Sequence, residues 1–389
     1  MNRNVLMAIV LVIIFCCGCQ GQTQDEVAVQ SPKTKVTDIA GLLAPIRQKH
    51  NVPAICAAVV NSDGIIAIGA VGLRRRDDIV PVTTNDLWHL GSDTKAMTAA
   101  VLGQLVEQKK ARWTTTLAEV FPEMAGRIHP QLKGVTLLQL LSHHAGLTEN
   151  LNWRSFASLG DIRRQRQAVL EQALTEKPKY TPGAEAHYSN LGYVVAGIAV
   201  ERISGKSWED QIHDSLFKPL GMTTAGFGGV GTPSRLDQPW GHRDDGSPVE
   251  GNGPDMDNAL VMAPAGCVHA DITDWSKFII DQLRGGMGKS ALMTPDTYRT
   301  LHTPPFGDDH ALGWLAVTRD WGGGTVLNHT GSNTMNYANT WLAPSRDFAV
   351  LVCINQGGDT AFAASDETVA ALIKALSDNA FASIPSEVK

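Results

Sequence analysis

Ser92 and Lys95 form a serine–lysine pair with S-x-x-K spacing inside the segment GSDTK. Residues three apart on a helix share one face, so these two side chains can touch. A serine at a helix N-terminus also faces free backbone N–H groups and the positive end of the helix dipole, which stabilise an oxyanion. A lysine on a buried helix loses its preference for the charged form and can act as a neutral base. The pair therefore suits acyl transfer through a serine nucleophile.

The same residues also have a purely structural interpretation, as the capped start of a helix. Two further S-x-x-K matches, Ser215/Lys218 and Ser386/Lys389, show how readily the spacing arises by chance. Taken alone, the motif favours a helix cap over a catalyst.

A tyrosine and an asparagine two residues apart, Tyr188 and Asn190, follow a Pro-Gly pair and precede a helical run. In such a loop the phenol could relay a proton, while the amide could orient a carbonyl or the lysine. The alternative is a tyrosine packed on the core with its hydroxyl satisfied. Tyr337 and Asn339 share the spacing, but they lie in an expected strand, where both side chains share a face and contribute to packing or to a cleft rim.

The segment His329-Thr330-Gly331-Ser332 follows three glycines and a short apolar run. A strand at a cleft edge could present His329 and Thr330 to the polar end of a substrate. Gly331 would allow close approach, and the backbone N–H of Ser332 could complete an oxyanion hole. The alternative is a polar strand-to-turn transition.

The elements that must position these residues begin near the N-terminus. The pattern predicts a helix over Asp38–His50 with Thr37 as its N-cap. Two apolar runs, Ala54–Val60 and Ile65–Val71, predict strands joined by an Asn-Ser-Asp-Gly turn. The helix that follows Ser92 is apolar almost all round and is therefore expected to be buried.

The rest of the chain separates into a helical middle and a mainly β end. Helical patches broken by Pro and Gly fill residues 110–300, most clearly at 137–141, 192–203 and 274–283. Strands are predicted at Thr325–Leu327, Tyr337–Leu342 and Phe348–Ile354, with a closing helix at Thr368–Leu376. We therefore expect an α/β (α+β) fold. One antiparallel sheet is built from both chain ends and flanked by terminal helices, and a mostly helical domain is inserted at about 110–300.

Composition narrows the class of protein. The chain has 389 residues, 43% of them hydrophobic and 19% charged, with a net charge of -6. It is long enough for a large core, and no basic surface indicates a nucleic-acid partner. Cys56, Cys267 and Cys353 are widely spaced, which predicts buried residues and neither a disulfide framework nor a zinc site. The neighbours His143 and His144 form no metal-ligand cluster, so no metal or other cofactor is expected.

The N-terminus has the pattern of an export signal over residues 1–19. Arg3 precedes the apolar run Val5–Phe15, which is shorter than the about 20 residues of a membrane-spanning helix. The run ends in a segment that resembles a bacterial lipoprotein cleavage site, with Cys19 as the lipidated residue. We predict a flexible tether at 20–36, a folded domain at 37–376 and a C-terminal tail at 377–389. The protein is expected to be exported, either periplasmic with a membrane tether through Cys19 or secreted.

Taken together, S-x-x-K, Y-x-N and H-T-G occur in this order at wide intervals. This arrangement resembles the serine β-lactamase/DD-peptidase superfamily, and specifically its class C-like branch of lactamases, D-peptidases and esterases. Further segments match surroundings familiar in that family: LLSHHAGL (140–147), PGAEAHYSNLGY (182–193), KPLGM (218–222), PAG (264–266) and LGW (312–314). The resemblance covers roughly residues 37–376.

The resemblance implies an active site between an α/β domain and a helical domain. Ser92 would be the nucleophile, and Lys95 with Tyr188 would shuttle its proton. The backbone N–H groups of Ser92 and Ser332 would form the oxyanion hole. The implied substrate-binding residues are Asn190, His329, Thr330 and Gly331. Because a helix start that suits a cap also suits an oxyanion, we expect Ser92 to serve in both roles.

A departure from the family pattern bears on the substrate. Class C lactamases usually carry K-T-G where this chain has His329-Thr330-Gly331, and histidine there is common among the family's peptidases and esterases. Losing the permanent cation disfavours a β-lactam carboxylate. We therefore expect an esterase or D-amino-acid peptidase with weak β-lactam hydrolysis. Its substrate would be a small molecule or peptide with an ester, amide or lactam carbonyl.

Three alternatives stay open: a true class C-like β-lactamase, a non-catalytic penicillin- or peptidoglycan-binding sensor, and a metal-dependent hydrolase. The chain has no G-x-S-x-G motif, which argues against an α/β-hydrolase triad. Two residues near the motifs, His269 and Asn333, are unusual for the family, and the sequence assigns them no role.

Overall fold

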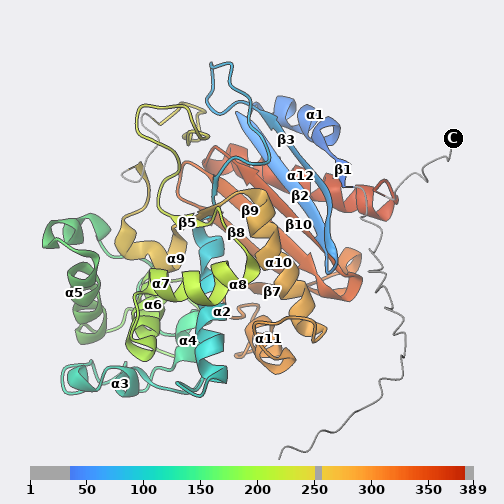
Figure 1. Ribbon diagram of the computed structural model, residues 1–389. Helices are drawn as coiled ribbons and strands as arrows, with labels where there is room; N and C mark the ends of the chain where they lie inside the picture. The colour runs from blue at the N-terminus through green and yellow to red at the C-terminus, as the bar shows by residue number, and fades with distance from the viewer. Residues whose placement is uncertain (1–35, 250–255, 382–389) are drawn as a thin grey trace, which may run out of the picture. The chain divides into compact units, whose positions relative to one another are not determined.

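A seven-stranded sheet combines strands from both ends of the chain (Figure 1), in the order β1-β3-β2-β10-β9-β8-β7. Its strands are β1 (Thr37–Asp38), β2 (Ala54–Asn61), β3 (Gly64–Gly72), β7 (Leu315–Arg319), β8 (Gly324–Ser332), β9 (Tyr337–Ala343) and β10 (Phe348–Ile354). Every neighbouring pair is antiparallel except β1 and β3, which run parallel over two residues. The predicted α/β fold, with an antiparallel sheet built from both chain ends, is confirmed.

The computed structural model describes residues 36–249 and 256–381. The predicted export signal, Cys19 and almost all of the predicted tether therefore lie outside the described residues, as do Ser386 and Lys389. Over the ranges that are described, no helix combines the length and the apolar character needed to cross a bilayer.

Strand β2 divides its side chains between two hydrophobic cores. Cys56, Ala58 and Val60 face the core shared with the helical region, whereas Ile55 and Val59 face the core under the terminal helices. This alternation follows from the two-residue period of a strand, and it explains why the run carries no polar side chain before its end. Asn61 closes the predicted turn, because its Oδ1 accepts the N–H groups of residues 63 and 64, each at 3.0 Å.

The three cysteines Cys56, Cys267 and Cys353 are buried free thiols, as predicted. Cys56 and Cys353 are register partners on β2 and β10. They fill space in the core of the sheet, which is the ordinary role of a small buried cysteine.

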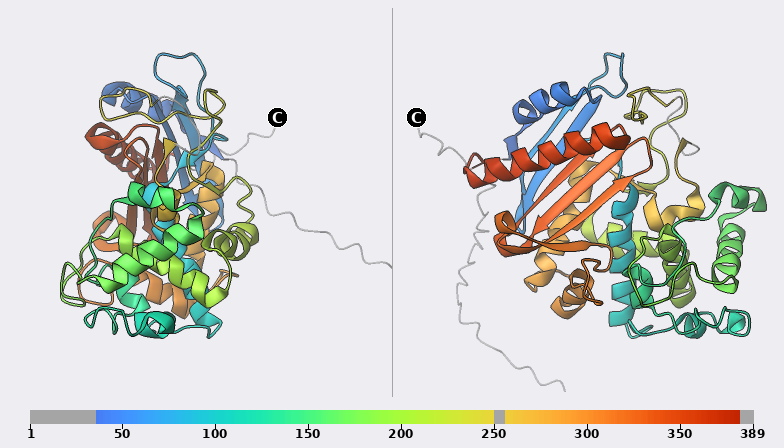
Figure 2. Two further views of the ribbon diagram at one scale, coloured as in Figure 1. Left: turned by 90° about the vertical axis from the view of Figure 1, so that its left-hand side faces the viewer. Right: turned by 180° about the vertical axis from the view of Figure 1, so that it is seen from behind.

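The terminal helices α1 (Ala40–His50) and α12 (Gly358–Ser377) cover one face of the sheet, as Figure 2 shows from behind. The predicted start of the first helix, at Asp38 with Thr37 as N-cap, is wrong. Both residues pair with β3 instead, and the N-cap position is Ile39. Asp38 Oδ1 accepts the N–H of Ala40 at 2.9 Å, so the carboxylate satisfies a backbone donor at the helix start.

The other face of the sheet carries the helical region. Its described helices are α2 (Thr94–Glu107), α3 (Leu117–Val120), α4 (Leu137–Leu141), α5 (Ile162–Thr175), α6 (Asn190–Ser204), α7 (Trp208–Ile212), α8 (Lys218–Leu220), α9 (Ala263–Gly266), α10 (Ile272–Gly286) and α11 (Pro295–His302). A second small sheet, not predicted from the sequence, joins β4 (Trp88–His89), β6 (Val268–Ala270) and β5 (Gly226–Phe227) in the order β4-β6-β5. This small sheet leads directly into the segment that carries Ser92.

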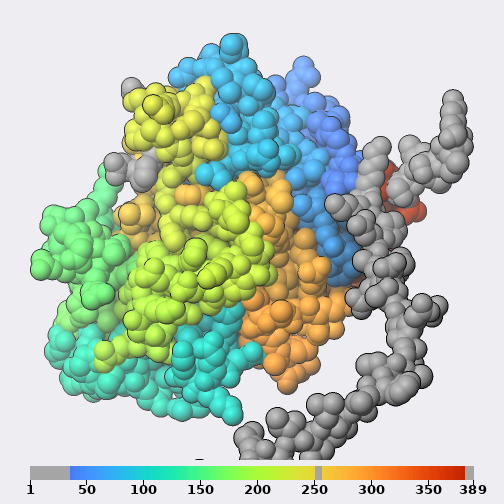
Figure 3. All heavy atoms as spheres, viewed as in Figure 1, coloured from blue at the N-terminus to red at the C-terminus, as the bar shows by residue number. Residues whose placement is uncertain are grey.

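Two loops from distant parts of the chain, 73–87 and 228–249, lie at one end of the sheet (Figure 1), and their atoms lie against each other (Figure 3). The backbone N–H of Trp240 donates to the carbonyl of Arg74 at 2.8 Å, and Arg76 Nε donates to the carbonyl of Gly246 at 2.8 Å. These bonds tie the helical region to the strands that begin the chain.

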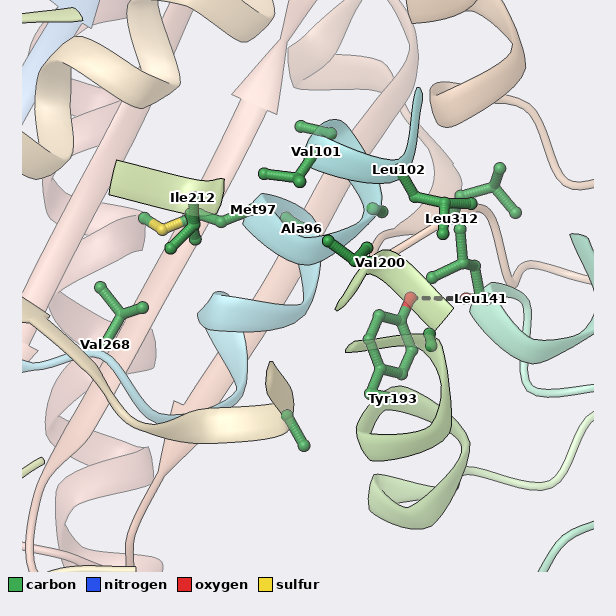
Figure 4. Close-up of a cluster of buried hydrophobic side chains, with 14 of the residues drawn as sticks. Ala96, Met97, Val101, Leu102, Leu141, Tyr193, Val200, Ile212, Val268 and Leu312 are labelled. Carbon is green, nitrogen blue, oxygen red and sulfur yellow. Dashed lines mark hydrogen bonds between the residues drawn. The ribbon is translucent and has the colours of Figure 1, made fainter. Parts of the chain in front are cut away.

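Helix α2 is buried on almost all sides, as predicted (Figure 4). Met97, Val101 and Leu102 pack in a cluster with side chains from α4, α6 and α7. The hydroxyl of Tyr193 on α6 donates a hydrogen bond to the carbonyl of Leu141 at 2.6 Å. A helix held in this way cannot shift along its axis without opening the core, so the residues at its start are firmly placed.

Candidate active site

Ser92 lies in a single 3₁₀ turn, Gly91–Asp93, immediately before α2. Its hydroxyl makes no capping bond, because neither this turn nor α2 has a side-chain cap, so the predicted capping role is wrong. Ser92 Oγ contacts Lys95 Nζ at 2.9 Å and receives a hydrogen bond from Tyr188 Oη at 2.7 Å. The serine hydroxyl thus bonds two side chains and does not bond the backbone at the helix end.

Lys95 is fully buried, and its amine touches three oxygen atoms. Besides Ser92 Oγ, these are Asn190 Oδ1 and the carbonyl of Ala265, both at 2.7 Å. The two carbonyl oxygens can only accept, so they take both N–H bonds of a neutral amine. The remaining lone pair then points at the one partner that carries a proton, the Ser92 hydroxyl.

Desolvation lowers the pKa of Lys95 to about 7, although the nearby Asp93 opposes this shift. A lysine in this state is neutral in a large fraction of molecules at ordinary pH. It therefore meets the two requirements of a general base for Ser92, contact with the hydroxyl and a free lone pair.

Tyr188 and Asn190 come from the segment that enters α6. Ser189 is the N-cap of this helix, with its hydroxyl accepting the N–H of Gly192 at 2.8 Å. His143 supports the same segment, since its Nδ1 accepts the N–H of Ser189 at 3.1 Å and its ring lies 4.6 Å from that of Tyr188. These contacts give His143 a structural role in holding the segment that carries Tyr188.

Desolvation raises the pKa of the Tyr188 hydroxyl above its ordinary value, so this phenol stays protonated and acts as a donor to Ser92. Asn190 is fixed from its other side, because its Nδ2 donates to Asn150 Oδ1 at 2.9 Å. That bond leaves Asn190 Oδ1 directed at the lysine. The structure therefore brings together four of the residues that the sequence singled out: Ser92, Lys95, Tyr188 and Asn190.

Strand β8 runs beside the Ser92 turn. A Cβ atom added at Gly331 would lie 1.9 Å from the carbonyl oxygen of Leu90 and 2.6 Å from the backbone nitrogen of Ser92. One added at Gly91 would lie 2.3 Å from the backbone nitrogen of Ser332, and Gly91 has a positive φ of 51°. Only glycine fits at either position, and the resulting close approach of the two backbones brings the segments that carry the Ser92 and Ser332 nitrogen atoms together.

His329 lies on β8 and is 8% exposed. Its Nδ1–H donates to the carbonyl of Gly313 at 2.7 Å, and desolvation lowers its pKa to about 3. The ring is therefore neutral, with Nε2 as an acceptor. It borders a cavity of about 260 Å³, which we call the His329 pocket, lined by His143, Tyr188, His310, Trp314, Leu315, Asn328, His329 and Thr330. No Asp, Glu, Lys or Arg is among these lining residues.

The rival motifs have ordinary structural roles. Ser215 Oγ donates to the carbonyl of Gln211 at 2.7 Å, four residues earlier in the chain. Asn339 is buried, and its amide bonds Ser365 and Asn328 at 3.1 and 3.0 Å. His269 donates from Nδ1 to the carbonyl of Gly228 at 2.9 Å and so holds the small sheet together.

Three contacts of the cluster escaped the sequence analysis: the Ala265 carbonyl, Asn150 and the support by His143. Two of these contacts had a signal in the sequence. Ala265 lies in the PAG segment and His143 in the LLSHHAGL segment, and both segments resemble the family. Within residues 36–249 and 256–381, no three or more His, Cys, Asp or Glu side chains are grouped so as to hold a metal ion.

Asp93 is a buried acid between Ser92 and Lys95. Neither of its carboxylate oxygens has a hydrogen-bond partner in another described residue. Desolvation raises its pKa well above the ordinary value, against the attraction of Lys95. The folded protein therefore keeps Asp93 protonated at a pH where the unfolded chain releases that proton.

This difference predicts a pH-dependent gain of stability for Asp93→Asn. Stability of the wild type falls as pH rises from the unfolded pKa, near 4, toward the folded one, by about 1.4 kcal/mol per pH unit. The variant lacks this loss, so its advantage in free energy of unfolding should grow over the same window. Urea titrations across a pH series measure it, with Asp63→Asn in the exposed β2–β3 turn as control. Parallel curves for Asp93→Asn and wild type would exclude a protonated Asp93.

A serine bonded to a buried lysine and a tyrosine, beside two glycine-flanked backbone nitrogens, is the arrangement of a serine hydrolase of the acyl-enzyme type. Residues 39–375 match the family described as Beta-lactamase. The chain belongs to that family.

Individual relatives agree with this assignment. The chain is 31% identical over 177 residues to Penicillin-binding protein 4 of Amycolatopsis lactamdurans, covering 46% of this chain and 45% of that protein. It is 25% identical over 339 residues to Unguisins hydrolase ungD' of Aspergillus campestris (strain IBT 28561), covering 82% and 61%. The chain thus spans about half to three-fifths of the length of these relatives.

The same fold occurs in a solved structure. The D-alanine carboxypeptidase AmpC from Burkholderia cenocepacia aligns with a TM-score of 0.68 at 17% identity, over 87% of this chain and 97% of that one. At this identity the likeness concerns the fold alone.

Proposed function

We propose that this protein is a serine hydrolase that acts through an acyl-enzyme on Ser92. Its substrates are esters or D-amino-acid amides and peptides, and β-lactam hydrolysis is weak or incidental. The observation that carries the proposal is the double contact of Ser92 Oγ with Lys95 Nζ and Tyr188 Oη.

The reaction follows from these contacts. Ser92 Oγ attacks the substrate carbonyl carbon while its proton passes to the Lys95 lone pair. The backbone N–H groups of Ser92 and Ser332 stabilise the oxyanion of the tetrahedral intermediate. The leaving group departs with the Tyr188 proton, which Lys95 then replaces. Water attacks the ester of Ser92, its proton returns through the same two residues, and the serine is released.

The His329 pocket supports the choice of substrate. Its ring is neutral, and no lining residue carries a fixed charge. A carboxylate placed there would lose hydration without gaining a cation, which is costly. Esters and amides without a carboxylate next to the cleaved bond are therefore preferred.

The proposal is tested with a substrate panel on the wild type. It contains a short-chain nitrophenyl ester, a D-Ala-D-Ala peptide with a free and with an amidated C-terminus, and a chromogenic cephalosporin. We expect turnover of the ester and the amidated peptide, slow cephalosporin hydrolysis, and a covalent adduct on Ser92 by mass spectrometry.

A long-lived penicillin adduct without turnover of any substrate would support the sensor alternative. Dominant cephalosporin turnover would support a true lactamase. Loss of activity in a chelator would support a metal-dependent hydrolase.

Replacing His329 with lysine is expected to create a preference for substrates with a carboxylate next to the cleaved bond. A cation at this position gains a charge-assisted hydrogen bond, so the ratio of kcat/KM for the free over the amidated peptide should rise about tenfold. His329→Gln, which stays neutral, is the matched control and should leave the ratio unchanged. An equal ratio in all three proteins would show that this position does not determine charge preference.

A further inference from the structure

A second polar cluster contacts the residues next to Ser92 and Ser332 and involves none of the proposed catalytic side chains. His89 on β4 contacts Asp257 through Nε2 and Oδ2 at 2.6 Å, and the two side chains are 1% and 0% exposed. The other carboxylate oxygen, Asp257 Oδ1, accepts the Nδ2–H of Asn333 at 2.7 Å. Asn333 itself is 5% exposed. Three buried polar residues from separate segments are thus joined through one carboxylate.

The orientation of the His89 ring follows from its second contact. Its Nδ1 accepts the backbone N–H of Gly91 at 3.1 Å, so the ring proton must be on Nε2, where it is donated to Asp257. Burial raises the pKa of Asp257, but His89 and Asn333 hold it below its ordinary value overall, so the carboxylate accepts from both sides. Every donor and acceptor in this chain of bonds has a defined direction.

Each end of the cluster touches one side of the oxyanion hole. Gly91, held by His89, directly precedes Ser92. Asn333 directly follows Ser332, and its Oδ1 accepts the N–H groups of Met335 and Asn336 at 3.2 and 2.9 Å. It therefore shapes the turn in which β8 ends. The two backbone nitrogens of the hole belong to segments that no covalent path joins locally, yet this cluster connects them through hydrogen bonds.

We propose that His89, Asp257 and Asn333 act as a positioning clamp that sets the spacing of the two oxyanion-hole N–H groups, those of Ser92 and Ser332. The clamp rests on the proposed function, because it acts only if these groups stabilise an oxyanion. None of the three residues contacts the nucleophile. Their effect is exerted through Gly91, whose positive φ of 51° is held by the bond to His89.

The energetic argument favours positioning over simple stability. A buried carboxylate held by two hydrogen-bond donors adds little net stability, because the cost of its desolvation offsets the hydrogen bonds that it gains. A hole with two donors, in contrast, loses much of its effect when one donor moves by a fraction of the hydrogen-bond length. A costly buried cluster at this place is therefore explained by the geometry that it enforces.

The test compares Asp257→Asn with the same substitution in a structural ion pair. Asparagine cannot accept from both His89 and Asn333, so the hole should widen. We expect kcat for the nitrophenyl ester to fall on the order of 100-fold, with KM changed less than about threefold. The carbonyl stretch of a slowly hydrolysed acyl-enzyme should move to higher frequency in the infrared, because its hydrogen bonds weaken. A boronic acid inhibitor should lose affinity in parallel with kcat/KM.

The control is Asp86→Asn, since Asp86 is also buried and forms a 2.6 Å ion pair with Arg74. It should lower stability without shifting the carbonyl frequency. The clamp is overturned if the wild type hydrolyses the ester and Asp257→Asn has the same kcat and the same carbonyl frequency. It is also overturned if Asp257→Asn and Asp86→Asn have the same effects. Should Asp257→Asn fail to fold, Asn333→Ala, which removes one arm only, is judged by the same criteria. Absence of turnover and of a Ser92 adduct in wild type would instead reject the proposed function, and the clamp with it.

Discussion

Ser92→Ala is expected to lower kcat/KM for the ester substrate on the order of 10⁵-fold, the largest effect of any single substitution in this chain. Alanine removes the only atom that can form the acyl-enzyme, while Lys95, Tyr188 and the backbone nitrogens stay in place. Residual activity would then come from the oxyanion hole and from binding. Stopped-time assays of ester hydrolysis, together with mass spectrometry for the adduct, measure this loss.

The matched control is Ser215→Ala, the same substitution in the other described S-x-x-K match. Its hydroxyl only satisfies a carbonyl one turn earlier, so activity should be retained within about twofold. Full turnover by Ser92→Ala, or an adduct on another residue, would refute the proposed nucleophile.

Lys95→Arg is expected to lower kcat on the order of 10³- to 10⁴-fold, although both residues have long basic side chains. Arginine is always protonated and cannot accept the Ser92 proton. Lys95→Met, which removes the amine altogether, should lose a similar amount. Lys218→Arg, at the exposed lysine of the second motif, is the control and should be unaffected.

The pH dependence gives an independent test of the same role. Only the neutral amine can accept a proton, so kcat/KM of the wild type should rise with pH and level off above the Lys95 pKa of about 7. In Lys95→Arg this rise should disappear. If both proteins show the same rising limb, another group is the base. If arginine supports normal turnover, lysine acts as a fixed charge only.

Much of the fold could be predicted because strongly apolar runs end at clear turn residues. The helix at Leu137–Leu141 and the strand at Phe348–Ile354 have the predicted bounds. Strand β7 was missed, since it is a partly exposed edge strand whose pairing depends on β8. The small sheet was missed for a related reason, because strands of two or three residues form only where tertiary contacts bring them together.

The site likewise contains residues that a local motif predicts and residues that only the fold brings together. Ser92, Lys95, Tyr188 and Asn190 belong to short motifs whose order along the chain is informative. Asp257 has no motif around it, and it meets Asn333 only through the fold. The helix α12 begins ten residues before the predicted Thr368, at Gly358, because its first turns bury alanines that carry little periodic signal.

Strand β10 fills the centre of the sheet between β2 and β9, although β2 and β10 come from opposite ends of the chain. Such long-range pairing gives a high contact order. This slows folding, because closing a long loop costs entropy before the contacts between distant segments can form. A nascent chain that stops before β8 would already carry nucleophile, base and proton donor, yet it would lack the second oxyanion donor and leave β2 with an open edge. Catalytic competence therefore requires the late strand β8, so turnover can report on whether the C-terminal part of the sheet has been added.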